Sequence, residues 1–304
     1  MTPVLVRQHL PHAGSTPRAD PGARARDWSE IQERMLVPLY EAVYERLDVG
    51  GGTRLLALGC GSGLALLMAA SRGAATLTGV ETSSPERLAL ARERLLPREE
   101  RANERPAHAR ADTRGGGTGA DHGRIRLIRR SPQDAADAET PAYDLVTAFE
   151  PIGCLAGDAD GLAGLLTAST PLAARGAPVV LVGWGPPERC ATSAVLRVAA
   201  KLADPLRSGP VRLRPALRDD LEEVARRAGL KPDGSGRVAC PFGYADVESA
   251  LKGLLSTGLF DAAVTATDQA QVDKELTEAL HPYRRADGTV WMPNVFRYLI
   301  ARTP

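Results

Sequence analysis

Five short and nearly continuous apolar runs lie in the first two thirds of the chain. Parallel strands that are covered on both faces have this pattern, because neither face meets water. The runs predict strands over residues 54–58, 76–81, 125–129, 143–149 and 178–183. Between them apolar residues recur at helical spacing, which predicts helices over residues 63–71, 85–96 and 159–174. Alternating strands and helices with right-handed crossovers form a doubly wound α/β sheet.

Both ends of the chain carry further periodic segments. A helical stripe begins at Trp28, and Pro38 within it is expected to kink the helix. The stripe is formed by Ile31, Met35, Leu39, Val43 and Leu47. The C-terminal third predicts strands near residues 235–241 and 294–300, and helices over residues 217–228, 247–257 and 269–281. Asp246 and Asp268 are the expected N-caps of the last two helices.

Two segments lack apolar periodicity. Residues 1–26 are rich in proline, arginine and glycine and are predicted to be a disordered tail, which leaves residues 27–304 as a single domain. Residues 97–124 are predicted to be an exposed loop or flexible insertion. The arginines of this insertion suggest an RNA-binding arm as an alternative. Interspersed acidic residues dilute their charge, so a solvated insertion is the preferred interpretation.

The sequence LLALGCGSG at residues 55–63 carries the strongest chemical signal. A predicted strand ends there, and its glycines lead directly into a predicted helix. Such a turn lets backbone N–H groups at a helix N-terminus approach a ligand without interference from Cβ atoms. Glu81 ends the next predicted strand, where its carboxylate can accept hydrogen bonds from ribose hydroxyls, each contributing about 1.5–3 kcal/mol. A tight turn that binds no ligand is the alternative.

The glycine spacing distinguishes this loop from the dinucleotide fingerprint, because Leu64 occupies the position of the third glycine of that motif. The spacing G-x-G-x-G followed by an acidic residue resembles motif I of the class I S-adenosylmethionine (SAM) methyltransferases. The order of elements over residues 28–304 is also similar to that family. The resemblance implies a mostly parallel, seven-stranded sheet whose last strand is inserted antiparallel. An N-terminal helical lid and C-terminal helical insertions would complete the fold.

The resemblance implies SAM as the cofactor and assigns residues to it. Glu81 would bind the ribose hydroxyls. Many relatives carry an acidic residue two positions before the first glycine, where this chain has Ala57. The loop that would hold the methionine end of SAM consists of Gly59, Cys60, Gly61 and Gly63.

The adenine would lie against the turn that follows the third strand. Two registers remain open for this turn. In one, Ser131 and Pro132 occupy the adenine-binding position, and the proline has no backbone N–H to offer. In the other, a slip past Gln133 places Asp134 there. Phe149, at the carboxyl end of the fourth strand, would form a further wall of the cofactor cleft.

Composition adds several exclusions. The chain has 304 residues, a formal net charge of +1 and 25% charged residues, so neither nucleic acid nor a membrane is expected as a partner. The N-terminus lacks the apolar segment of a secretory signal, and no run approaches the ~20 apolar residues of a membrane span. The four cysteines are scattered without a C-x-x-C pair, which favours reduced thiols over disulfides or a metal site. We therefore expect a cytoplasmic protein.

Methyl transfer requires little beyond alignment of an activated methyl group with a nucleophile about 3–3.5 Å away in a dry pocket. No universal catalytic residue exists for it, and none is assigned. Glu150 follows the fourth strand and is either a general base or a cap of the next segment. The expected function is SAM-dependent methylation of a small organic molecule at an O, N or C atom. The alternatives are a non-catalytic SAM- or nucleoside-binding regulator and an NAD-dependent oxidoreductase.

The acceptor is expected beyond the carboxyl ends of the first and fourth strands. Three segments can cover that opening: residues 28–40, 184–207 and 242–283. Their aromatic and apolar residues predict a covered, largely apolar cleft. The N-terminal helix is predicted to be a lid that orders when cofactor and acceptor bind.

Overall fold

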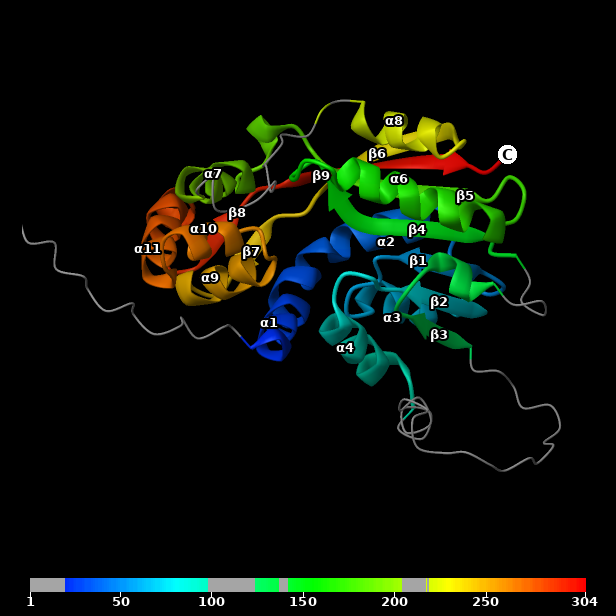
Figure 1. Cartoon of the computed structure of the whole chain (residues 1–304), viewed down its shortest axis with the longest axis horizontal. Coiled ribbons are helices and arrows are strands. Elements are labelled where there is room, and N and C mark those ends of the chain that lie inside the picture. Colours follow the sequence, from blue (N-terminus) through cyan, green and yellow to red (C-terminus); the bar gives the residue numbers. More distant parts are fainter. Residues whose placement is uncertain (1–19, 98–123, 137–141, 204–216, 218) are drawn as a thin grey trace, which may run out of the picture.

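The computed structural model describes residues 20–97, 124–136, 142–203, 217 and 219–304. These residues form a twisted sheet with helices on both faces and a smaller helical cap (Figure 1). The predicted insertion lies, apart from its two end residues, outside the described residues. The same is true of residues 1–19 of the predicted tail.

The sheet has seven strands in the order β3-β2-β1-β4-β5-β9-β6. The first five strands of this order pair in parallel, and β9 is antiparallel to both β5 and β6. The predicted doubly wound, mostly parallel sheet with its last strand inserted antiparallel is confirmed. The strands are β1 (Arg54–Leu58), β2 (Thr76–Val80), β3 (Ile125–Ile128), β4 (Leu145–Ile152), β5 (Pro178–Trp184), β6 (Lys231–Ala239) and β9 (Val295–Arg302).

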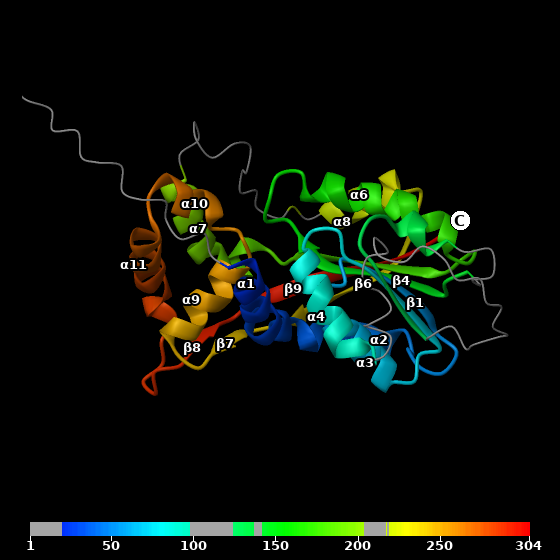
Figure 2. The ribbon, with the colours of Figure 1, turned by 60° about the horizontal axis from the view of Figure 1, so that its bottom comes forward.

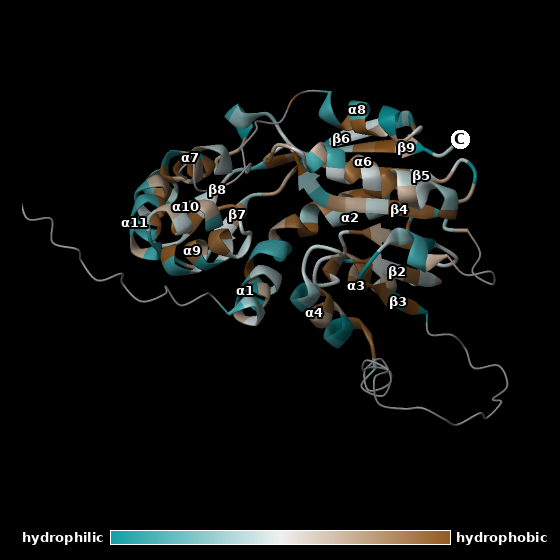
Figure 3. Cartoon of the chain, viewed as in Figure 1, coloured by the Kyte–Doolittle hydropathy of each residue, from teal (hydrophilic) through white to brown (hydrophobic). Residues whose placement is uncertain are grey.

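Side-chain alternation along each strand divides the core into two layers. In β1, Leu55 and Ala57 belong to one buried cluster, whereas Leu56 and Leu58 belong to the other. One layer is covered by α2 (Val37–Arg46), α3 (Leu64–Ser71) and α4 (Pro85–Leu95), and the other by α6 (Asp158–Ser169) and α8 (Asp220–Arg227). Figure 3 shows apolar residues concentrated on the strands and hydrophilic ones on outer helix surfaces such as that of α8.

The N-terminal segment is helical earlier than the sequence predicts. Helix α1 (Pro21–Asp27) begins after Asp20, whose carboxylate accepts hydrogen bonds from the N–H groups of Gly22 at 3.0 Å and Ala23 at 3.2 Å. The predicted disordered tail is therefore wrong for residues 21–26. The chain continues through a π-helical turn, η1 (Trp28–Gln32), and a 3-10 turn, η2 (Glu33–Leu36), into α2. The helix changes type just before Pro38, which lacks the N–H that the preceding turn would bond.

A helical cap lies beyond the carboxyl ends of the parallel strands (Figure 1). The helices predicted at residues 247–257 and 269–281 are present there, whereas α7 and α10 were not predicted. The predicted strand near 235–241 ends at Ala239, and the next strand, at residues 242–244, pairs with residues 290–292 in a separate two-stranded antiparallel sheet. The cap elements are α7 (Thr192–Leu202), β7 (Phe242–Tyr244), α9 (Val247–Ser256), α10 (Asp261–Ala266), α11 (Gln269–Leu280) and β8 (Val290–Met292).

Short 3-10 turns connect several of these elements. They are η3 (Pro132–Ala135), η4 (Thr170–Leu172), η5 (Pro187–Arg189) and η6 (His281–Tyr283). In the parts of the chain that the structure describes, no helix has the length and apolar character needed to cross a membrane.

Candidate functional site

The loop between β1 and α3 takes a backbone path that favours glycine. Gly59, Gly61 and Gly63 have φ angles of +63°, +57° and +81°, in the left-handed region that other residues enter only at a cost. Helix α3 begins directly afterwards, so the loop presents the N-terminal end of a helix at the carboxyl edge of the sheet. The predicted strand–glycine turn–helix arrangement is confirmed.

Glu81 lies directly after β2 and reaches back to this loop. Its carboxylate accepts a hydrogen bond from Gly61 N at 2.9 Å, and others from Ser83 N at 2.8 Å and Ser84 N at 3.2 Å. The side chain is 2% exposed. Glu81 therefore ties the glycine loop to the start of α4, a structural role that the sequence did not predict. Binding of a ribose by this carboxylate stays a prediction.

A second buried carboxylate, which the sequence did not reveal, caps the same loop. Glu33 of η2 is 2% exposed and accepts hydrogen bonds from Ser62 N at 3.1 Å, Leu64 N at 3.4 Å and the Ser62 hydroxyl. Arg94 of α4 donates to its Oε2 at 3.0 Å. Burial raises the pKa of Glu33, although the bonds from Ser62 and Arg94 act against the increase. A glutamate inside a predicted helix gives no sequence signal for such a contact.

Trp28 of η1 packs on the middle of the glycine loop. A Cβ atom on Gly61 would lie 2.5 Å from Cη2 of the indole ring, so the backbone and the ring are in direct contact. The guanidinium of Arg87 lies over the face of the ring, 3.9 Å from its centroid. Burial lowers the pKa of Arg87, while the negative charges of Glu150, Glu81 and Glu33 act in the opposite direction.

A cavity of about 400 Å³ opens beside this cluster, at the carboxyl ends of β1 and β4. The N-terminal segment crosses it, and α1 lies between α4 and α9 (Figure 2). The covered cleft predicted from the sequence is confirmed. Residues from all three predicted covering segments line it, namely Trp28, Gln32, Glu33, Leu36, Tyr40, Trp184, Phe242, Thr257 and Leu259. Ordering of the lid on ligand binding stays a prediction.

Glu150 projects into this cavity beside the first glycine. A Cβ atom on Gly59 would lie 3.2 Å from Oε2 of Glu150. Surrounding protein raises the pKa of Glu150, and the charge of Glu81 raises it further. Capping of the following segment is performed by Asp158 instead, which accepts hydrogen bonds from Gly153 N at 2.7 Å and Cys154 N at 3.1 Å. Of the two interpretations of Glu150, the general base is the one that stays a prediction.

Of the residues predicted to hold the adenine, Phe149 lines the cavity and the four residues of the 131–134 turn do not. Ser131 is the N-cap of η3, and Asp134 accepts a hydrogen bond from Ser131 N at 3.1 Å, so both belong to one capped turn. None of Ser131, Pro132, Gln133 and Asp134 lines the cavity. Phe149 does line it, but its ring is 5% exposed and packs against the aromatic residues of α2.

Cys60 lines the cavity as well. Its thiol is buried, and burial raises its pKa, so it is an unreactive wall and not a nucleophile. All four cysteines are free and buried. Among the residues that the structure describes, no group of histidine, cysteine, aspartate and glutamate side chains is placed to hold a metal ion.

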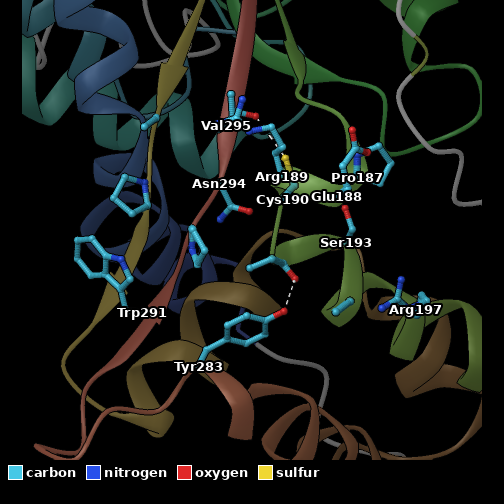
Figure 4. A pocket seen from close by; sticks show the side chains of 15 residues that line it. Pro187, Glu188, Arg189, Cys190, Ser193, Arg197, Tyr283, Trp291, Asn294 and Val295 are labelled. Carbon is cyan, nitrogen blue, oxygen red and sulfur yellow. Dashed lines mark hydrogen bonds between the residues drawn. The ribbon is translucent and has the colours of Figure 1, made fainter.

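A second, more open groove of about 860 Å³ lies between the start of α7 and the β8–β9 connection (Figure 4). Arg189, Arg197 and the rings of Tyr283 and Trp291 line it. Its floor is fixed by internal hydrogen bonds, such as that from Thr192 N to the side chain of the buried Asn294 at 3.1 Å. It shares no lining residue with the cavity at the glycine loop.

Comparison with known proteins gives similarity at the level of structure. No protein-family model matches the chain, and no curated protein sequence matches it. YjhP from Escherichia coli aligns at 20% identity over 93% of this chain and 99% of that one, with a TM-score of 0.49. Geranyl diphosphate C-methyltransferase from Streptomyces coelicolor, solved with Mg²⁺, geranyl diphosphate and S-adenosyl-L-homocysteine, aligns at 14% identity over 90% and 80%, with a TM-score of 0.45. The cyclase SpnF aligns at 18% identity over 88% and 80%, also with a TM-score of 0.45.

Proposed function

We propose that this protein is a SAM-dependent methyltransferase that acts on a small organic molecule. One observation carries the proposal: a glycine loop at a helix N-terminus and the carboxylate of Glu81 meet beside a covered cavity at the carboxyl ends of β1 and β4. Ligands of open α/β sheets bind at this edge. The cavity volume of about 400 Å³ falls within the usual range for small-molecule sites.

The residues of the site fit the cofactor in shape and charge. Gly59 and Gly61 leave no side chain between the loop and its neighbours, which permits close approach of a ligand. The carboxylates of Glu81 and Glu150 lie beside the loop and suit a ligand that carries an ammonium and a sulfonium group. When bound there, SAM would supply a methyl group that is already activated for displacement.

The chain's own residues would then orient the acceptor and exclude water. Trp184, Phe242 and Phe296 pack together at one side of the cavity, with ring centroids 4.5–6.2 Å apart. They favour an apolar acceptor. Glu150 is the cavity carboxylate without a capping task and would accept the proton that an O–H, N–H or C–H acceptor loses. Its raised pKa makes it a stronger base than an ordinary glutamate.

One observation favours the second candidate function, a non-catalytic SAM- or nucleoside-binding protein. The N–H groups of Gly61, Ser62 and Leu64 already donate to the protein's own carboxylates, which lowers the number of donors open to a ligand. A protein that uses the fold only to bind SAM or a nucleoside, without turnover, can function with this reduced number of free donors. Turnover separates the two functions.

The test begins with calorimetric titration of SAM, S-adenosylhomocysteine and NAD. The proposal expects binding of the first two and none of NAD. Incubation with SAM and panels of apolar alcohols, amines and activated C–H compounds should then release S-adenosylhomocysteine with at least one panel. Binding without release in any panel supports the non-catalytic function. Failure of both SAM and S-adenosylhomocysteine to bind refutes both.

A further inference from the structure

The glycine loop has no backbone donor left for a ligand along its central stretch. Cys60 N donates to Val80 O at 3.0 Å, and Gly63 N to Cys60 O at 2.9 Å. Gly61 N donates to Glu81 at 2.9 Å. Ser62 N and Leu64 N donate to Glu33 at 3.1 and 3.4 Å. Helix N-termini with free N–H groups bind anions, and here an anion from the chain itself takes that place.

The indole ring of Trp28 covers the remaining approach to the loop. Its edge lies where a Cβ atom on Gly61 would be, at 2.5 Å for Cη2 and 2.8 Å for Cζ3. Arg87 stacks on the ring at 3.9 Å from the centroid and donates to Ser256 O at 3.4 Å. The ring thus contacts the loop through its edge and, through its face, a cation that is anchored to α9.

Arg94 of α4 lies outside the cavity and donates hydrogen bonds to η1, η2 and the glycine loop. It donates to Glu33 Oε2 at 3.0 Å, to Ser62 O at 2.9 Å and to Ser29 Oγ at 2.9 Å. Ser29 and Ser62 also bond to each other through their hydroxyls at 2.7 Å. Arg94 does not line the cavity. It therefore holds η1 and η2 against the loop without forming part of the surface that a ligand would touch. We call the hydrogen bonds from Arg94 to Ser29, Glu33 and Ser62 the clasp.

We propose that Trp28 and Glu33 form an internal plug of the cofactor site, held by Arg94, and that SAM binds only after η1 and η2 move off the glycine loop. The inference rests on the proposed function, because it takes the glycine loop to be where SAM binds. The structure is then the closed, self-inhibited state. The N-terminal lid is therefore ordered before SAM binds, and SAM replaces the Glu33 carboxylate and the Trp28 ring at the glycine loop.

A plugged site lowers the apparent affinity for SAM by the fraction of molecules that are open. Loosening the clasp should therefore tighten SAM binding. Arg94→Gln is the sharpest variant, because it weakens the clasp without altering the cavity lining. Glu33→Gln weakens the plug itself. Arg175→Gln, an exposed arginine in the loop before β5, is the matched control for loss of a positive charge. Circular dichroism shows whether each variant is folded.

The expected result is that SAM binds Arg94→Gln and Glu33→Gln about fivefold or more tightly than wild type, with Arg175→Gln unchanged. Equal or weaker binding by both variants, with normal binding by wild type, overturns the plug and leaves the SAM site standing. Failure of wild type and all variants to bind SAM overturns the proposed function together with the plug.

A kinetic measurement on wild type keeps the plug testable if the variants do not fold. Opening of the plug is a unimolecular step that precedes binding, so the observed binding rate should reach a plateau as the SAM concentration rises. Stopped-flow tryptophan fluorescence follows this rate, because Trp28 leaves its position under Arg87. A rate that increases linearly with SAM concentration and has no plateau overturns the plug.

Discussion

Because Trp28 packs against Gly61, an alanine at position 61 should lower the free energy of unfolding more than an alanine at a glycine that has a similar positive φ but no neighbouring atoms. In Gly61→Ala, the alanine must adopt the φ of +57° that Gly61 has. This costs about 1–2 kcal/mol, because the left-handed backbone conformation is unfavourable for L-residues. The new Cβ also overlaps Trp28 Cη2 at 2.5 Å, and overpacking of this kind costs about 1–3 kcal/mol. The expected total loss of unfolding free energy is about 2–5 kcal/mol.

Gly229 is the matched control, since its φ is +72° and nothing lies within 4 Å of the Cβ that an alanine would add. Gly229→Ala should therefore lose only the backbone part, about 1–2 kcal/mol. Urea denaturation of both variants measures the difference. The excess cost at Gly61 should shrink when Trp28→Ala is added, because the ring that the Cβ meets is gone. Equal costs for Gly61→Ala and Gly229→Ala would show that Trp28 does not rest on the loop in solution.

Three further outcomes are expected. Glu81→Ala should lose about 1–3 kcal/mol of unfolding free energy, because it leaves the buried N–H of Gly61 without an acceptor; an unchanged denaturation midpoint contradicts this. Glu150 is exposed to the cavity, yet desolvation by the surrounding protein and the charge of Glu81 raise its pKa above the ordinary value of 4.5. The wild type should therefore lose stability as the pH rises from 4.5 to the raised pKa, because the folded state holds this proton more tightly than the unfolded state. Glu150→Gln should thus gain in thermal midpoint relative to wild type as the pH rises above 4.5, and a difference independent of pH refutes the assignment. Deletion of residues 1–48 should prevent folding, because Leu39, Val43 and Tyr44 are fully buried and each contributes about 2–5 kcal/mol; deletion of residues 1–19 should not, and circular dichroism distinguishes the two.

The Trp28–Glu33 region also revises the lid predicted from the sequence. A lid that contributes only contacts to substrate could be removed without loss of the fold. Here the same segment supplies α2, whose buried face is part of the main core. Within the N-terminal segment, the loop contacts described above come from Trp28, Ser29 and Glu33 of η1 and η2, so the proposed movement concerns the turns before Pro38. The π and 3-10 geometry at this point marks a common site of helix irregularity near functional residues.

Much of the fold was determined by the sequence alone, because its causes are local. Parallel strands need continuous apolar runs, and the runs at residues 54–58 and 178–183 place β1 and β5 to within a residue. The three loop glycines were readable for the same reason, since each satisfies a backbone requirement of its own position. N-caps such as Asp246 and Asp268 were also readable, because a cap acts on N–H groups three residues away.

The arrangement of the site was decided by tertiary structure. Glu33 and Ser62 are separated by 29 residues, and nothing in the local pattern of either shows that a carboxylate will meet that N–H. Helices α7 and α10 were not predicted either. In α7 the buried residues Val195, Val198 and Ala199 do recur at helical spacing, so its period was present but missed, whereas α10 has six residues and is too short for a period to identify. Local propensity acts over a few residues, whereas the partner of a buried charge is selected by desolvation. A buried carboxylate must be bonded wherever the folded chain brings donors together, and only the folded chain specifies where that is.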